Sequence, residues 1–569
     1  MSVGCQVRNE KNLAMTLQTS ENGAMLIGDL RSAAAQMVMP RIEGRQLADP
    51  AYRNGMAKLA EEGIGGFILF GGDIGSTPSY LSDVGSRSAV PLMISSDVER
   101  GLGQQLAGGT RFPSQRAVAS AVNRRSKRDA DLLHAMLDAV RTEARAAGIH
   151  IVFSPVMDVN NNPDNPIICT RSFGETPETV EWFGSRYIRR LQKAHPDGTL
   201  DLLACAKHFP GHGDTDQDSH SVLPLIRADK ARLNRVELPP FREAVKDGVG
   251  TVMVAHLLVP ALDPLKPVTF SKKVVTALLR EGMEFEGLIV SDALDMGALA
   301  NEYPPDEIAV RAVEAGMDIL LHPADPRKTV DAVVKAVEQG RLTEERIQES
   351  VDRILAWKKK LGLFTPLHPP LARGETKGGV SARGEKEGGA GPKIDYARHR
   401  KISEQLASKA LKVVRGQRWL ASFSTGKSVS CFIVDDDGVN EGGAFRDAMV
   451  QLFGDVRAVT LDPGTSGPGL APHLDLSASG PVVLAIFSKI SASKGRSGIS
   501  PALRDRSFEI IRRAKAARKP VAVISFDSPY LLDQFKEADV LIAGYDRMDA
   551  IQKAAAELIA GKKDEGIRL

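Results

Sequence analysis

The sequence predicts an α/β protein: a (β/α)8 (TIM-type) barrel followed by a smaller α/β sandwich domain. Three observations lead to this prediction. Short continuous apolar runs alternate with helical patterns before residue 366, a Gly- and Pro-rich segment spans 366–393, and a second alternating region follows it. Continuous apolar strands separated by helices are typical of a parallel sheet whose two faces are both covered.

Seven apolar runs in the first region have the length of buried strands. They are Gly66–Phe70, Pro91–Ser95, His150–Val156, Leu202–Ala206, Thr251–Ala255, Leu288–Ser291 and Asp318–Leu321. A helix is predicted over 126–147, because Ser126 can cap it, an apolar stripe repeats with helical spacing, and Gly148 can end it. Seven such units over about 340 residues favour the barrel. An open doubly wound sheet is the alternative.

The segment Pro366–Lys393 contains seven glycines and four prolines in 28 residues and has no apolar periodicity. It cannot bury enough apolar surface to offset the entropy of ordering it, so we predict a flexible linker. The chain then divides into a polar N-terminal segment (1–29), the barrel (30–365), the linker (366–393) and the C-terminal α/β domain (394–569). Strands of the last domain are predicted at Val429–Val434, Ala458–Leu461, Val482–Phe487, Val521–Phe526 and Val540–Ala543, with a helix at Phe508–Ala517.

The composition excludes several classes of function. A net charge of +3 on 569 residues gives no electrostatic basis for binding nucleic acid or an anionic membrane. The four cysteines are scattered, as expected of reduced buried thiols. We find neither a secretory signal nor an apolar run long enough to span a membrane, so a cytoplasmic location is expected.

Ionisable side chains follow five of the predicted strands. In barrels of this type the active site lies at the carboxyl ends of the strands, so these side chains should converge on one mouth. They are Asp97 and Glu99, Lys207 and His208, His256, Asp292, and His322.

The segment Lys207–His220 is the densest polar stretch, with three histidines, three aspartates and a lysine. His208 and His212 have the spacing of a zinc pair, but that spacing requires a helix. Pro210 and the glycines on either side of His212 prevent the helix, so no metal site is predicted.

Asp218 and His220 are separated by one residue. In an extended loop their side chains point the same way, so the carboxylate can orient the imidazole and raise its basicity, as a general acid/base requires. A solvated polar loop is the alternative.

Asp292 stands where an apolar strand ends and a helix is expected to begin. A carboxylate at this place can act as a nucleophile or stabilise a developing charge, and it can also simply cap the helix. Asp295 is expected to serve the first turn of that helix.

Four segments together resemble glycoside hydrolase family 3, within it the bacterial β-N-acetylglucosaminidase (β-hexosaminidase) branch in its two-domain form. They are Lys207–His220, Val290–Leu299, Asp97–Gly101 and Arg171–Gly174, within a likeness covering roughly 30–365. The family commonly shows Asp-Gln-Glu-Gly-Gly where this chain has Asp97-Val98-Glu99-Arg100-Gly101. Arg100 therefore adds a cation beside the expected pocket.

The resemblance implies a role for each matched residue. Asp292 would be the nucleophile, and His220 the acid/base with Asp218 as its partner. The side chains that would hold the hydroxyls of the sugar are those of Asp97, Arg171, Lys207 and His208. No cofactor is implied, and the C-terminal domain would be structural or form a pocket wall.

The predicted function is that of an enzyme, a retaining glycosidase that removes terminal β-linked N-acetylglucosamine, with cell-wall recycling as its setting and a small carbohydrate or muropeptide fragment as substrate. Alternatives within the family are a β-N-acetylglucosaminide phosphorylase and a β-glucosidase. A more distant alternative is a non-catalytic sugar-binding protein.

Overall fold

The computed structural model describes residues 29–364, 394–423, 428–464, 476, 480–492 and 494–562, and also the antiparallel strands β1 (Leu17–Thr19) and β2 (Met25–Ile27). The predicted linker, 366–393, lies outside the described residues. None of the described helices is long and apolar enough to cross a membrane.

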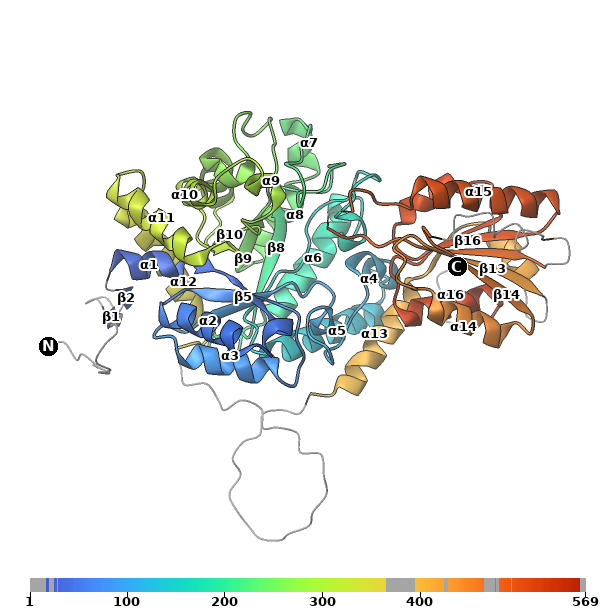
Figure 1. The fold of residues 1–569 in the computed structure, drawn as a ribbon, viewed down its shortest axis with the longest axis horizontal. Coiled ribbons are helices and arrows are strands. Elements are labelled where there is room, and N and C mark those ends of the chain that lie inside the picture. The colour runs from blue at the N-terminus through green and yellow to red at the C-terminus, as the bar shows by residue number, and fades with distance from the viewer. Residues whose placement is uncertain are drawn as a thin grey trace, which may run out of the picture.

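The first domain is built around a curled parallel sheet, which confirms the predicted α/β class (Figure 1). Seven strands pair in the order β10-β9-β8-β7-β6-β5-β4. Their bounds are β4 Arg41–Glu43, β5 Gly66–Phe70, β6 Met93–Ser96, β7 Ile151–Val152, β8 Leu203–Phe209, β9 Thr251–Val254 and β10 Leu288–Ser291. All seven residues of β8 are buried, as expected of a strand covered on both faces.

Further pairings extend the sheet beyond β10. Ile319 bridges to Val290, and the adjoining strand β11 (Leu320–Leu321) pairs in parallel with β3 (Val38–Met39). Only Pro40 separates β3 from β4. β3 and β4 have no counterpart among the predicted strands, because runs of two and three residues are too short to show a strand pattern.

Helices cover the outside of this sheet. The longest is α5 (Lys127–Ala146), where the Ser126 side chain caps the first turn, Leu133 and Leu137 are buried, and Gly148 takes a positive φ of 80° just beyond the helix. The other helices are α1 Leu30–Gln36, α2 Pro50–Glu61, α3 Thr77–Ser86, α4 Gln115–Ala121, α6 Pro177–Leu191, α7 Lys230–Arg235, α8 Pro239–Lys246, α9 Gly297–Ala300, α10 Pro305–Ala315, α11 Pro326–Glu338 and α12 Glu344–Lys360, with a π-helix at Lys273–Glu281.

The second domain contains a six-stranded sheet in the order β12-β17-β16-β15-β13-β14. The strands are β12 Lys412–Arg415, β13 Val429–Asp435, β14 Val456–Leu461, β15 Val482–Phe487, β16 Val521–Ser525 and β17 Val540–Ala543. The helices α14 (Gly443–Leu452) and α16 (Asp549–Ile559) lie on one side of this sheet, and α15 (Pro501–Ala516) lies on the other (Figure 1). The antiparallel edge strand β12 was not predicted, since it is exposed and lacks a continuous apolar run.

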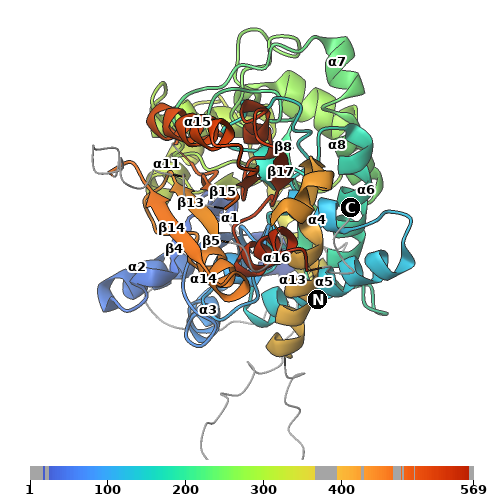
Figure 2. The same cartoon turned by 90° about the vertical axis from the view of Figure 1, so that its right-hand side faces the viewer.

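Helix α13 (Tyr396–Ala410) joins the two domains. It packs against α4 and α5 of the first domain and against α16 of the second (Figure 2). His399 Nδ1 lies 2.6 Å from the buried carboxylate of Glu143 in α5. These contacts tie α13 to both domains.

Candidate active site

The structure brings the predicted site residues together at one cavity of about 1480 Å³. Six of them line it, namely Asp97, Arg171, Lys207, His208, His220 and Asp292, and Asp218 lies buried behind His220. Asp97 follows β6 and Asp292 follows β10. Lys207 and His208 are among the last three residues of β8, which runs three residues further than predicted. The cavity therefore opens at the carboxyl edge of the sheet.

Four alternating charges form one end of the cavity. Lys207 Nζ lies 2.7 Å from Asp97 Oδ1 and 2.7 Å from Glu99 Oε1. Arg171 binds the same Glu99 with two hydrogen bonds of 2.7 and 3.0 Å. Two cations and two anions thus balance one another, which allows them to remain charged although largely buried.

Opposing effects act on the pKa values of these groups. Burial alone would raise the pKa of Glu99, but the charges of Arg171 and Lys207 hold it well below its ordinary value. Burial alone would lower the pKa of Lys207, but Asp97 and Glu99 raise it above its ordinary value. The cluster therefore presents fixed donors and acceptors, which suit a ligand rich in hydroxyl groups.

This charge balance leads to a stability prediction. Lys207→Met should lower the free energy of unfolding by about 3–5 kcal/mol, because it leaves buried carboxylates without their shared cation. Denaturant unfolding measures the change. The matched control is Lys246→Met, whose side chain is 75% exposed and pairs only at the surface, and it should stay within about 0.5 kcal/mol of wild type. Equal losses in the two variants would contradict the role given to Lys207.

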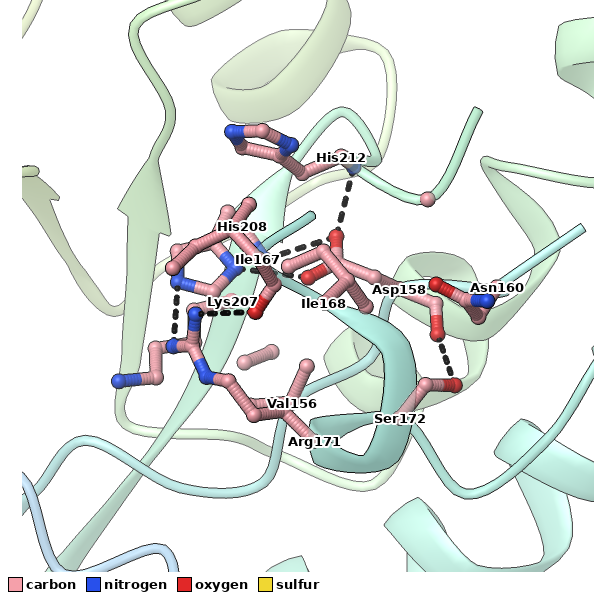
Figure 3. Close-up of polar contacts among 12 residues, drawn as sticks. Val156, Asp158, Asn160, Ile167, Ile168, Arg171, Ser172, Lys207, His208 and His212 are labelled. Atoms are coloured by element: carbon pink, nitrogen blue, oxygen red, sulfur yellow. Dashed lines mark hydrogen bonds and ion pairs between the residues drawn. The ribbon is translucent and has the colours of Figure 1, made fainter. Parts of the chain in front are cut away.

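Asp158 organises the histidines of the cavity and was missed from the sequence. Its Oδ2 lies 2.7 Å from His208 Nδ1, and its Oδ1 accepts the backbone N–H groups of His208 and His212 at 3.1 and 2.7 Å (Figure 3). Its carboxylate is completely buried. The one available signal was its place two residues beyond the predicted strand His150–Val156, of which only Ile151–Val152 forms β7.

Three of the four ring nitrogens of His208 and His212 lie beside other protein groups. His208 uses Nδ1 for Asp158, and its Nε2 lies 3.2 Å from Arg171 Nη2. His212 Nε2 lies 2.9 Å from the hydroxyl of Ser219. Burial and the charge of His208 lower the pKa of His212 to about 4, so its imidazole is neutral at physiological pH. Within the described ranges, no three His, Cys, Asp or Glu side chains are grouped to hold a metal ion.

Asp218 and His220 form the predicted pair. His220 Nδ1 lies 2.8 Å from Asp218 Oδ1, which also accepts the backbone N–H of His220 at 3.0 Å. The Asp218 side chain is 2% exposed and that of His220 is 36% exposed. A buried carboxylate thus orients an imidazole whose other nitrogen is free to face the cavity.

The loop that carries this pair is docked on the chain after Asp292. The backbone N–H of Gly297 donates to the carbonyl of His220, and that of Ala298 donates to the carbonyl of Ser219, both at 3.2 Å. A side chain at position 297 would place its Cβ only 2.7 Å from the His220 carbonyl oxygen, so this close approach requires glycine.

Asp292 is held by the backbone on both sides. Its N–H donates to the carbonyl of Val254 at 3.0 Å, and its Oδ1 accepts the N–H of Ala293 at 2.8 Å. Burial raises the pKa of Asp292, but the charges of His208 and His256 and the Ala293 N–H outweigh it and lower this pKa to about 2. Asp292 is therefore a carboxylate across the physiological range.

His256 supports the chain beside Asp292. Its ring is completely buried, with Nε2 2.9 Å from the carbonyl oxygen of Ala293 and Nδ1 2.7 Å from Thr269 Oγ1. These contacts make His256 a support of the pocket wall beside Asp292.

The expected role of Asp295 in the first turn of a helix is wrong. The helix α9 begins at Gly297, beyond Asp295, and the Asp295 carboxylate instead lies 2.9 Å from Nδ1 of His322, which follows β11. Both residues line the cavity.

The second domain contributes to the wall of the cavity. Arg100, the cation that departs from the family pattern, forms an ion pair with Asp546 of that domain, and Asp546 also accepts the Ser114 N–H at 2.7 Å. Glu441 and Arg547 of the second domain form an ion pair at the same cavity. Of the two parts expected of the second domain, structural support or a pocket wall, its residues contribute to the wall, and Arg100 helps to bind that wall to the first domain.

The chain has relatives among known proteins. It is similar to a β-hexosaminidase A of Pseudoalteromonas piscicida, 32% identical over 329 residues that cover 52% of this chain and 54% of that protein, so the match spans about half the length of that relative. It is also similar to a β-N-acetylglucosaminidase/β-glucosidase of Cellulomonas fimi, 26% identical over 548 residues that cover 90% and 89% of the two chains.

A solved structure extends the likeness to both domains. The glycoside hydrolase family 3 β-N-acetylglucosaminidase from Paenibacillus sp. str. FPU-7 is 29% identical, with a TM-score of 0.76 over 94% of this chain and 97% of that one. Residues 30–357 match the family model described as the glycosyl hydrolase family 3 N terminal domain. The predicted resemblance is confirmed. Because the family model matches more than half of this chain, the chain belongs to glycosyl hydrolase family 3.

Proposed function

We propose that this chain is a retaining β-N-acetylglucosaminidase that removes terminal β-linked N-acetylglucosamine by double displacement. The observation that carries the proposal is the Asp218–His220 pair, 2.8 Å apart, on the same cavity as the ionised Asp292. One side of the cavity thus offers a nucleophile, and another offers a proton carrier. We infer that the curled sheet is the (β/α)8-type barrel expected from the sequence, with the active site at its mouth.

In the first step Asp292 attacks the anomeric carbon, and His220 gives its proton to the glycosidic oxygen as that bond breaks. A glycosyl ester of Asp292 results, and the aglycone leaves as an alcohol. In the second step His220 takes a proton from water, whose oxygen attacks the anomeric carbon and releases Asp292. Two inversions give net retention, and both catalytic groups return to their starting states.

The remaining site residues hold the sugar. The balanced cluster of Asp97, Glu99, Arg171 and Lys207 would bind vicinal hydroxyl groups, since charged hydrogen bonds are strong and directional. Names of relatives support the N-acetyl sugar: a β-hexosaminidase, a β-N-acetylglucosaminidase/β-glucosidase and a β-N-acetylglucosaminidase. We place the reaction in the cytoplasm, on fragments of the cell wall.

A panel of aryl β-glycosides tests the proposal. Release of the aryl group from the N-acetylglucosaminide should exceed release from the glucoside and the xyloside. Preference for the glucoside would instead make the chain a β-glucosidase. If the protein binds the sugar but cleaves none of the glycosides, it is a non-catalytic sugar-binding protein.

The panel also separates hydrolysis from phosphorolysis. A neutral histidine base repels an incoming anion less than a carboxylate base does, which is the specific reason to consider phosphate as an acceptor. The assay is run with and without phosphate, and the sugar product is identified. Free sugar in phosphate buffer is the expected product, and glycosyl phosphate would identify a phosphorylase.

The pKa of Asp292 sets the expected pH dependence. Because the carboxylate form is the reactive one, activity dependent on it is lost only as the pH falls toward about 2. In a His220→Ala variant with an activated aryl leaving group, kcat/KM should therefore stay flat from pH 7 down to about pH 4. A loss centred at pH 5 or above would mean that a different group is the nucleophile.

A further inference from the structure

The loop that carries Arg171 is contacted by the second domain. This loop lies between β7 and α6, and its short 3-10 turn at Cys169–Arg171 places Arg171 in the cavity. Tyr530, in the 3-10 turn Pro529–Gln534 of the second domain, reaches it from outside. The Tyr530 hydroxyl accepts the Asn160 side-chain N–H at 3.0 Å and lies 3.1 Å from Glu175 Oε1, to which it can donate.

Asn160 connects Tyr530 to Arg171. It is almost fully buried, and its Oδ1 accepts the backbone N–H of Cys169, the first residue of the turn, at 2.9 Å. Its own backbone N–H donates to the carbonyl of Gly174 at 2.9 Å, on the other side of Arg171. Asn160 thus holds both ends of the short segment that contains Arg171, one end through its side-chain amide and the other through its backbone N–H, beside Ser172 and Asp158 (Figure 3).

Arg171 has little freedom to respond to a shift of this segment. Its guanidinium makes two hydrogen bonds to Glu99, one to the carbonyl of Ile167 at 3.3 Å, and lies 3.2 Å from His208. A rigid planar group with this many fixed partners is misplaced when its backbone moves by a fraction of an ångström.

The hydroxyl of Tyr530 is suited to this task. It is largely buried, and burial raises its pKa above the ordinary value of tyrosine, so it stays protonated. One atom can then accept from Asn160 and donate to Glu175 at the same time, which fixes the orientation of the amide.

We propose that Tyr530 is a positioning residue through which the second domain, by way of Asn160, sets the place of Arg171 in the sugar-binding cluster. The inference rests on the proposed function. It gives the second domain a part in gripping the sugar, although none of its residues belongs to the reacting groups.

Tyr530→Phe tests this proposal, because it removes the hydroxyl and keeps the ring. We expect kcat/KM to fall about tenfold on whichever aryl β-glycoside the wild-type protein cleaves. The loss should be the same for good and poor leaving groups, since the grip on the sugar and not the proton transfer is altered. The thermal midpoint and circular dichroism spectrum are measured alongside, to show that the variant is folded.

A second background tests the route to Arg171. Arg171→Lys keeps the charge but loses the two-pronged contact with Glu99. In the Arg171→Lys background, Tyr530→Phe should lower kcat/KM less than twofold, because the guanidinium that Tyr530 positions is already absent. A further tenfold loss of kcat/KM in the Arg171→Lys background would overturn the proposal. So would a loss of kcat/KM confined to substrates with poor leaving groups.

Ser497→Ala is the matched control. The Ser497 hydroxyl, also in the second domain, donates a hydrogen bond to the same loop, to the Pro163 carbonyl at 3.2 Å. Among the described residues it makes no hydrogen bond with Asn160. Its kcat/KM should stay within twofold of wild type, and an equal tenfold loss would show a general loosening of the domain interface instead. Failure of the proposed function looks different, since wild type itself would then turn over no glycoside.

Discussion

Asp292→Asn is expected to lower kcat/KM by on the order of 10⁴-fold or more while leaving the fold unchanged. The amide has nearly the same shape and can still accept the Ala293 N–H, but it cannot form the glycosyl ester. Hydrolysis of an aryl β-N-acetylglucosaminide gives the rate, and thermal unfolding shows that the variant is folded.

Asp295→Asn is the control for this variant. Asp295 is a second carboxylate on the same cavity, three residues on, engaged with His322. The kcat/KM of Asp295→Asn should remain at least a hundredfold higher than that of Asp292→Asn. Near-wild-type activity of Asp292→Asn would mean that another group attacks the sugar.

His220→Ala should slow substrates with poor leaving groups by on the order of 10²–10⁴-fold, and substrates with activated leaving groups far less in their first step. Only a poor leaving group needs the proton of His220. With an activated substrate the second step becomes slow, so the glycosyl ester should accumulate. Peptide mass spectrometry should then find the sugar on the peptide that contains Asp292.

His195→Ala is the matched control for this change. His195 also pairs with an aspartate, its Nε2 lying 3.0 Å from Asp201, but this pair is near the surface and away from the cavity. Its kinetics should match wild type on every substrate. Equal losses of His220→Ala on good and poor leaving groups would show that His220 does not supply the proton.

The proposed reacting groups were candidates from the sequence because each lies in a local pattern. Asp292 ends an apolar strand, and Asp218 and His220 are two residues apart, but a helix cap and a solvated loop fitted these patterns equally, so the roles came from the family resemblance. Strands such as Gly66–Phe70 and Leu288–Ser291 were predicted to the residue for the same reason: a buried parallel strand is a continuous apolar run.

The supporting groups could not be predicted, because their contacts are distant in the chain. Asp158 meets His208 across 50 residues, and Arg100 meets Asp546 across 446. No periodicity or spacing encodes such pairings. The predicted role of Asp295 was wrong for a related reason. Its partner His322 follows another strand, β11, and Asp295 contacts this histidine and not the first turn of a helix.

The missing side chain at Gly297 has a consequence for protein engineering. A Cβ at position 297 would lie only 2.7 Å from the carbonyl oxygen of His220, so the loop that carries His220 and the segment after Asp292 depend on each other for their packing. The two positions are 77 apart in the sequence. Whoever grafts a loop from a relative onto this scaffold must therefore transfer or preserve both segments together, since either one alone would arrive without the surface that holds it.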